Sequence, residues 1–321
     1  MPVFNKTALI FSVLVLSGLA GFSQTRDSIP EKIKAYVADK FPMARVLNLE
    51  YNTVSPYRFS SKFLGTALPE GKVENFYQLK ASANINFISN RKWTLGTIVN
   101  YRYVSVGLEN ENNKRDFQYH SESLNLTRYA TLFGKVVVFT ASAIVDGSEH
   151  DFERVRGVLT GTIVLKATRQ TQMAVGLIGL IDPGAIVPVV PSFSYKHQFR
   201  NGWLADVILP KGLLLRKNVF ANGRFSIGSE LENTFFYLYN VDKSGKTYSL
   251  NQMEINSGLT YEHHLGGSFI ATVKSGMKNM IEAKVFEKSA RQNDYIFKAI
   301  PEASLYFNIG LSFNPFGQKK K

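Results

Sequence analysis

The stretch Ala303–Phe313 (ASLYFNIGLSF) places an apolar side chain at every second position near the end of the chain. Successive side chains of a β-strand point to opposite faces of the sheet. The intervening residues are small, polar or interfacial, so we expect one face of this strand to meet an apolar medium and the other a wet one. The alternating apolar residues are Ala303, Leu305, Phe307, Ile309, Leu311 and Phe313.

The same alternation recurs from Ala44 onward, clearly so in Leu79–Phe87, Val137–Val145 and Leu159–Ala167. Segments of about ten residues with a period of two, separated by turns, are typical of transmembrane β-barrels. The sequence predicts roughly fourteen strands, or twelve if the two short segments around Pro210 form one bent strand or a loop. The predicted ranges are 44–55, 73–88, 92–107, 116–132, 135–146, 154–167, 171–181, 188–199, 203–209, 212–218, 222–239, 247–264, 268–279 and 297–313.

The connections between these segments alternate in length. The short ones are 89–91, 133–135, 168–170, 200–202 and 265–267, and the longer ones are 55–72, 109–115, 146–151, 241–245 and 281–294. Short periplasmic turns and longer external loops give this alternation in a membrane barrel. A secreted sandwich or soluble barrel is the alternative fold, because those sheets also have a dry and a wet face. Strands of roughly 12–18 residues, against about 5–6 in soluble sheets, favour the all-β transmembrane antiparallel barrel.

The first 23 residues have the pattern of a cleaved signal peptide. Lys6 supplies the positive region, Ala8–Ala20 the apolar region, and Gly21 and Ser23 the small residues before a cut at Gln24. The apolar region is shorter than the roughly 20 residues that a spanning helix needs. We therefore predict a signal peptide over 1–23, a periplasmic segment over 24–43, an outer-membrane barrel over 44–316 and a basic tail over 317–321.

The segment that follows the signal peptide has a partly helical pattern over Asp27–Phe41. This pattern fits a short periplasmic helix, a partial plug of the barrel or a flexible leader. No later segment is long and apolar enough for a transmembrane helix, so entry into a membrane requires a closed barrel, in which every backbone group is paired.

Composition excludes several classes of site and partner. The chain has no cysteine, which excludes disulfides, thiolate metal sites and a lipid anchor on cysteine. The formal charge of +13 could suit nucleic acid. Export argues against such a partner, and the basic residues are scattered over presumed turns, loops and the tail. Contact with anionic lipid phosphates, or simple solvation, explains them better.

The sequence offers little for catalysis. A membrane hydrolase needs a nucleophile, a base and an oxyanion site at one level of the barrel. The predicted external loop Asp146–Asp151 holds Ser148 and His150, but Glu149 would oppose a developing oxyanion. His120, His197, His263 and His264 are interpreted as interfacial or turn residues. We predict no catalytic, cofactor-binding or metal-binding residues, with a hydrolase as the least favoured alternative.

Strand parity predicts that ten charged side chains of both signs face the barrel interior. They are Lys80, Arg102, Lys166, Lys196, Asp206, Arg224, Glu230, Glu254, Glu262 and Lys274. Mixed signs do not predict strong ion selectivity and favour pairs between opposite walls. Twelve to fourteen strands enclose more space than eight, whose interior side chains can fill. The sequence therefore predicts a non-enzymatic pore or transporter for small solutes or apolar molecules, or alternatively a structural or surface-binding barrel.

The tail Asn308–Phe316 resembles the C-terminal signal read by the barrel-assembly machinery, with a polar residue, Gly310 two positions on, and then Phe313 and Phe316. Gly317–Lys321 extend past the usual terminal aromatic residue. The chain also resembles uncharacterised outer-membrane β-barrel proteins of Gram-negative bacteria, in Leu68–Val73 and Leu209–Gly212. The resemblance implies a bacterial outer-membrane location. Lipids, lipopolysaccharide and the assembly machinery would then be its partners. It implies no activity, cofactor or cargo.

Overall fold

A computed structural model of the protein describes residues 40–42, 44–109, 114–182, 184–185, 187–241 and 245–315. The predicted signal peptide (1–23), the predicted segment 24–43 apart from residues 40–42, and the basic tail (317–321) lie outside the described residues. Within the described ranges, no helix has the length and apolar character needed to cross a membrane.

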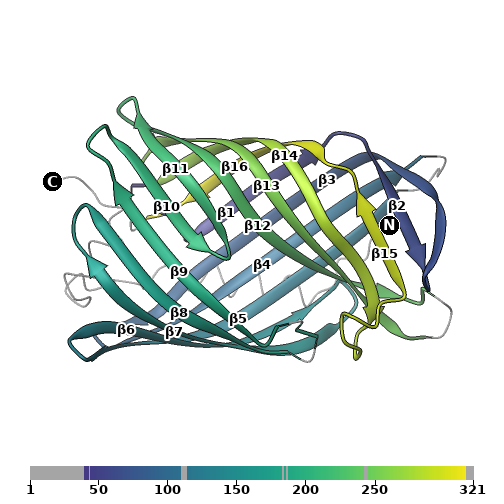
Figure 1. The fold of residues 1–321 in the computed structure, drawn as a ribbon, viewed down its shortest axis with the longest axis horizontal. Coiled ribbons are helices and arrows are strands. Elements are labelled where there is room, and N and C mark those ends of the chain that lie inside the picture. The colour runs from purple at the N-terminus through teal and green to yellow at the C-terminus, as the bar shows by residue number, and fades with distance from the viewer. Residues whose placement is uncertain are drawn as a thin grey trace.

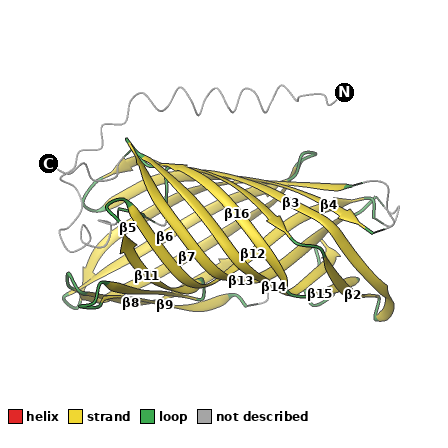
Figure 2. Ribbon diagram, turned by 90° about the horizontal axis from the view of Figure 1, so that it is seen from above, coloured by secondary structure: helices red, strands yellow, loops and turns green. Residues whose placement is uncertain are grey.

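Sixteen strands form one antiparallel sheet that closes on itself (Figures 1 and 2). They are β1 (Leu47–Val54), β2 (Tyr57–Phe63), β3 (Thr66–Ser89), β4 (Trp93–Leu108), β5 (Arg115–Leu132), β6 (Lys135–Gly147), β7 (Phe152–Ala167), β8 (Thr171–Ile181), β9 (Val189–Gln198), β10 (Trp203–Leu209), β11 (Gly212–Val219), β12 (Gly223–Tyr239), β13 (Thr247–Gly266), β14 (Phe269–Glu287), β15 (Phe297–Pro301) and β16 (Ser304–Phe313).

The barrel wall is fourteen strands around, although the structure has sixteen strands. At two positions in the wall, two short strands lie end to end and together span it. β1 and β2 both pair with β3, and β15 and β16 both pair with β14. The pairs β1–β16 and β2–β15 close the barrel. β10 and β11 are separate paired strands, so the higher of the two predicted strand numbers is confirmed.

The expected long loop 55–72 is wrong, because most of it forms the hairpin of β2 with the first part of β3. Leu64 and Gly65 make its two-residue turn, both with positive φ (48° and 84°), as twist-matched hairpin turns require. Pro56, Pro69 and Gly71 interrupt the alternation here, which is why the sequence pattern indicated a loop. The expected loop 281–294 is likewise shorter, since β14 continues to Glu287.

The two ends of the barrel differ. The turns β3–β4, β5–β6, β7–β8, β9–β10, β11–β12 and β13–β14 share one end, named here the short-turn end, and the opposite end is named the long-loop end. Exposed aromatic side chains lie beside the short turns at Phe87, Trp93, Phe133 and Phe199. Phe316, the last aromatic residue of the C-terminal pattern, lies outside the described residues.

The outer and inner faces of the barrel wall differ as the alternation in Ala303–Phe313 predicted. On β16, Leu305, Phe307, Ile309 and Leu311 are exposed on the outside, while Tyr306, Asn308 and Ser312 are buried on the inside. An apolar outer face and a polar inner face are the arrangement of a membrane barrel.

The wall bends inward where β12, β13 and β14 approach the long-loop end. Consecutive residues, which point to opposite faces, are both buried there: Phe236 with Tyr237, Tyr248 with Ser249, and Val285 with Phe286. Nearer the short turns, the paired glycines Gly228, Gly258 and Gly276 form a row across the three strands. A Cβ at these positions would lie 2.1–2.2 Å from a carbonyl oxygen of the adjacent strand, so the close approach of the strands requires glycine.

Candidate functional site

A polar cavity of about 430 Å³ lies inside the barrel, in the half nearer the short-turn end. Charged residues of both signs line it: Arg45, Glu50, Lys211, Arg216, Arg224, Glu230, Glu262 and Lys274. Among its other lining residues are Asn48, Ser82, Asn84, Asn100 and Thr272, which are short and polar. Such a lining suits water and small polar solutes rather than an acyl chain.

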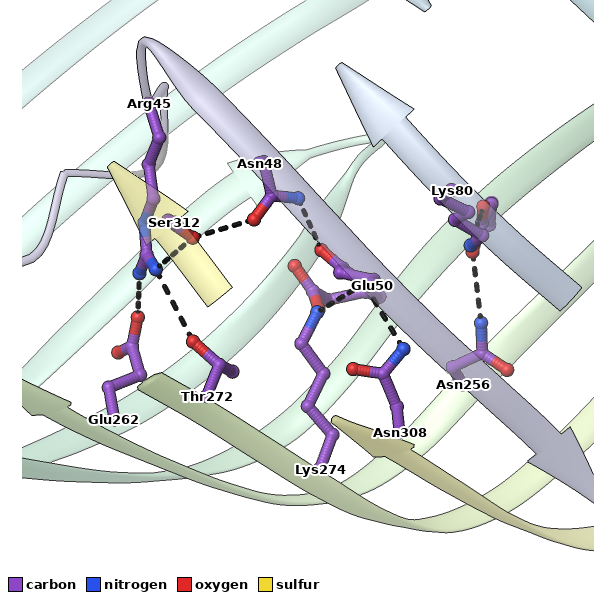
Figure 3. Close-up of polar contacts among 12 residues, drawn as sticks. Arg45, Asn48, Glu50, Lys80, Asn256, Glu262, Thr272, Lys274, Asn308 and Ser312 are labelled. Atoms are coloured by element: carbon purple, nitrogen blue, oxygen red, sulfur yellow. Dashed lines mark hydrogen bonds and ion pairs between the residues drawn. The ribbon is translucent and has the colours of Figure 1, made fainter. Parts of the chain in front are cut away.

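Hydrogen bonds run along one wall of this cavity (Figure 3). The Arg45 guanidinium donates to Ser312 Oγ at 2.9 Å, and Ser312 Oγ donates to Asn48 Oδ1 at 2.6 Å. The Asn48 amide then donates to Glu50 at 2.7 Å, and Lys274 Nζ lies 3.9 Å from the other Glu50 oxygen. Each group orients the next, so the wall is held in one arrangement.

Glu262 ties two positively charged residues together at the end of this chain of bonds. Arg45 binds one of its oxygens, and Arg224 Nε binds the other at 2.7 Å. All three side chains are at most 10% exposed. A buried carboxylate of this kind needs its cations, because an unpaired charge is costly away from water.

Beyond the cavity, charged residues from non-neighbouring strands meet across the interior. Glu232 on β12 accepts hydrogen bonds from Lys80 on β3 and from Arg102 on β4, the latter at 2.8 Å. Arg102 also donates to Thr234 of β12. This bridge narrows the interior at about the middle of the barrel.

An apolar cluster fills the interior between this bridge and the long-loop end. Phe117 on β5 packs against Phe236 on β12, with ring centroids 5.7 Å apart. The buried members of the cluster are Val54, Val73, Phe76, Val104, Phe236 and Tyr306. Together the Glu232 bridge and this cluster form what we call the constriction, where side chains of β3, β4, β5 and β12 meet across the interior.

A second ionic network joins the inward bend of β12 to β6 and β7. Asp146 is fully buried and is bound by Arg156 and by the Tyr237 hydroxyl, with Arg154 Nε 3.9 Å away. Asp182 lies 3.3 Å from Arg154. The sequence placed Asp146 in an external loop, but β6 continues to Gly147 and turns this carboxylate inward.

Most of the ten predicted interior residues take part in ion pairs between strands. Lys80 and Arg102 bind Glu232, Arg224 binds Glu262, and Lys274 lies between Glu50 and Glu230 at 3.9 and 4.0 Å. Asp206 pairs with Arg216 at 3.1 Å, and Glu254 pairs with Lys278 at 2.8 Å. Lys196 lines a separate cavity at the short-turn end.

Lys166 departs from the expectation. The pairing of β7 with β8 shifts register between Val164 and Lys166, so Lys166 pairs with Met173 and its side chain is exposed. A one-residue bulge reverses which face each later residue occupies. Parity counted along the sequence therefore placed Lys166 on the wrong face.

Several interior residues were missed. Glu232 and Lys278 lie two and four residues from the predicted interior residues Glu230 and Lys274 on the same strands, so the same alternation points to them. Glu50 lies on β1, where the prediction named no interior residue. Arg45 falls within the predicted strand 44–55, but β1 begins only at Leu47, so strand alternation does not govern its side chain.

The loop proposed for a hydrolase does not assemble a catalytic pair among the described residues. The Ser148 hydroxyl bonds to the Tyr239 hydroxyl and accepts from the backbone N–H of His150 at 3.1 Å. The His150 ring packs edge-on against Tyr239 at 4.6 Å. Within the ranges that the structure describes, no group of three or more potential metal ligands is present.

We expect His150→Ala to leave folding and the amount of membrane-inserted protein unchanged, because the ring is mostly exposed and its bond to Ser148 uses the backbone. Lipase, acyltransferase and protease assays of the purified protein are expected to give no activity. Hydrolysis that disappears in the folded His150→Ala variant would make this loop an active site.

Comparison with known proteins assigns no family. No family model matches the chain, and no curated protein matches it. Solved structures with a similar shape include an outer-membrane channel from Pseudomonas putida F1 (TM-score 0.38, 9% identity, covering 85% of this chain and 97% of that one). A FadL homologue from Pseudomonas aeruginosa has a TM-score of 0.30 and 9% identity, covering 86% of this chain and 91% of that one. The outer-membrane protease OmpT from Escherichia coli has a TM-score of 0.25 and 9% identity, covering 86% of this chain and 99% of that one. At these TM-scores and identities the likeness assigns no function.

Proposed function

We propose that the barrel spans the bacterial outer membrane with the short-turn end in the periplasm. The exposed apolar residues of the outer face support this location. Eight of them, on eight different strands, are each at least 46% exposed: Leu124, Phe139, Leu159, Leu177, Leu213, Ile227, Leu259 and Phe307. Such a surface is costly in water and favourable in lipid.

We propose further that the protein is a non-enzymatic gated channel for small polar solutes. The observation that carries this proposal is the pairing of a polar interior cavity with a constriction made of side chains. Backbone pairing holds the wall, whereas the constriction depends on the Glu232 ion pairs and the Phe117–Phe236 contact. Side-chain contacts can separate without unfolding any strand, so a gate made of them can open while the wall stays folded.

Planar-bilayer recording tests the gate. The wild-type protein is expected to be mostly closed, and Glu232→Gln combined with Phe236→Ala is expected to open it. A charge-assisted hydrogen bond contributes about 1.5–3 kcal/mol, so its loss should raise the ratio of open to closed channels about 10- to 100-fold.

The control for this recording is Glu109→Gln, which removes a carboxylate that pairs with Lys72 on the exposed rim. It should leave the open probability at the wild-type value. A double variant that folds but conducts no more often than wild type would contradict the gate.

A structural barrel is the second candidate, favoured by the number of ion pairs that tie opposite walls together. It predicts a folded protein with no conductance in the wild type, in Glu232→Gln/Phe236→Ala or under applied voltage.

A further inference from the structure

Both tryptophans of the chain lie on the outer face at the short-turn end, and a cation lies over each ring. Trp93 is the first residue of β4, and Trp203 is the first residue of β10. The Arg128 guanidinium carbon lies 5.0 Å from the centroid of the Trp93 ring, and Lys217 Nζ lies 5.3 Å from that of Trp203. Contact with an indole face holds a cation in place, but it adds no formal negative charge to neutralise the cation.

Arg128 is exposed on the outer face of β5, two residues from the exposed Leu126. It lies opposite Trp93 of β4 on one side and opposite Phe139 of β6 on the other. Its guanidinium makes no hydrogen bond or ion pair with any residue that the structure describes. A charge without a partner is costly beside lipid, so this cation requires an anion from outside the protein.

Lys217 repeats this arrangement on β11. It lies opposite Trp203 of β10 on one side and opposite Phe225 of β12 on the other. The exposed Leu215, two residues away, marks the same outer face. Within the described ranges, the Lys217 ammonium also has no hydrogen bond or ion pair. The wall therefore carries two alike groups, each a cation between a tryptophan and a phenylalanine on three neighbouring strands.

The six short turns add positive charge at the same end. The residues between their strands include no aspartate or glutamate, and the basic ones are Arg91, Lys92, Arg169 and Arg200. The connection 148–151 at the long-loop end, in contrast, holds two carboxylates. A row of cations at one edge of the apolar belt attracts an anionic membrane surface.

We propose that Arg128, with Trp93 and Phe139 beside it, binds the headgroup of an anionic phospholipid in the leaflet at the short-turn end, and that Lys217 binds a second one. The sites rest on the proposed membrane location and are independent of the gate. The guanidinium donates to two phosphate oxygens of the headgroup, and the ammonium supplies a single charge. The aromatic rings lie at the level where the headgroup meets the acyl chains.

Quenching of tryptophan fluorescence tests the sites one at a time, because the chain has two tryptophans and each belongs to one site. The full-length protein with Trp203→Phe reports on the Arg128 site alone. It is refolded into phosphatidylcholine vesicles in which part of the lipid is brominated near the headgroup, as phosphatidylglycerol or as phosphatidylcholine. Bromine quenches an indole on contact, so quenching against lipid fraction gives the relative binding of the two lipids at Trp93.

Phosphatidylglycerol is expected to bind at Trp93 about fivefold more strongly than phosphatidylcholine, the effect of one cation at an anionic membrane surface. Arg128→Gln should remove most of this preference, whereas Arg128→Lys should retain part of it because the charge remains. The matched control is Lys62→Gln, which removes a cation near the tip of the β2–β3 hairpin at the long-loop end and should leave the preference unchanged.

The protein with Trp93→Phe reports on the second site, where Lys217→Gln should lower the preference in the same way. This second measurement keeps the proposal testable if Arg128→Gln does not fold. Equal binding of the two lipids at either tryptophan, or a preference that survives neutralisation of its cation, would overturn the site there and leave the membrane location intact. No quenching by either lipid would contradict the membrane location itself, and the two sites with it.

Discussion

Asp146→Asn is expected to lower the free energy of unfolding by about 3 kcal/mol, near the lower end of the range for breaking a buried ion pair. The carboxylate is fully buried and is the main partner of Arg156, and it also accepts from the Tyr237 hydroxyl. Neutralising it leaves a buried guanidinium poorly paired. Asp182, 3.3 Å from Arg154 and 4.0 Å from Arg156, keeps the cost from rising further.

Urea unfolding of the protein refolded into lipid vesicles measures this change. Glu149→Gln is the matched control, three residues away on the long-loop side, with a side chain 40% exposed. Its effect should stay within about 0.5 kcal/mol. An equally small effect of Asp146→Asn would show that the network between β6, β7 and β12 does not stabilise the inward bend.

Phe307→Arg is expected to lower the free energy of unfolding in lipid by about 2–4 kcal/mol. Phe307 is 46% exposed on the outer face of β16. It lies six residues from Phe313, about 20 Å along a strand, which at a tilt of about 40° places it about 15 Å from the short-turn end. That depth is near the centre of an apolar belt about 25 Å tall, where a guanidinium cannot be hydrated.

Leu64→Arg is the control for depth, since Leu64 sits at the tip of the β2–β3 hairpin at the opposite end. It should cost no more than about 1 kcal/mol, the value for a charge near the interface. Phe307→Leu controls for loss of the ring. Equal effects of the two arginine substitutions would argue that the outer face does not contact lipid.

Phe307→Arg tests the outer face of the barrel, and Asp146→Asn tests its interior. The outer face depends only on apolar side chains at alternate positions, whereas the interior depends on partners contributed by strands far apart in the chain. The Lys80–Glu232 pair joins residues 152 positions apart, and the Arg45–Glu262 pair joins residues 217 apart. A single substitution inside the barrel therefore disturbs several strands together.

The alternation by itself predicted an all-β antiparallel barrel of twelve or fourteen strands and identified the wet and dry faces of β16, and the pairing of β10 with β11 then decided for fourteen. Periodicity suffices for this, because the side chains of any strand alternate whatever its neighbours are. The tertiary structure decided the rest. It paired β2 with β3 where prolines obscured the alternation, and it put Lys166 outside because a bulge reversed its parity.

The constriction and the burial of Asp146 also depended on tertiary structure. Each of them is set by which strands face each other across the interior, and that follows from the closure and inward bend of the whole wall. No spacing within a single segment carries that information.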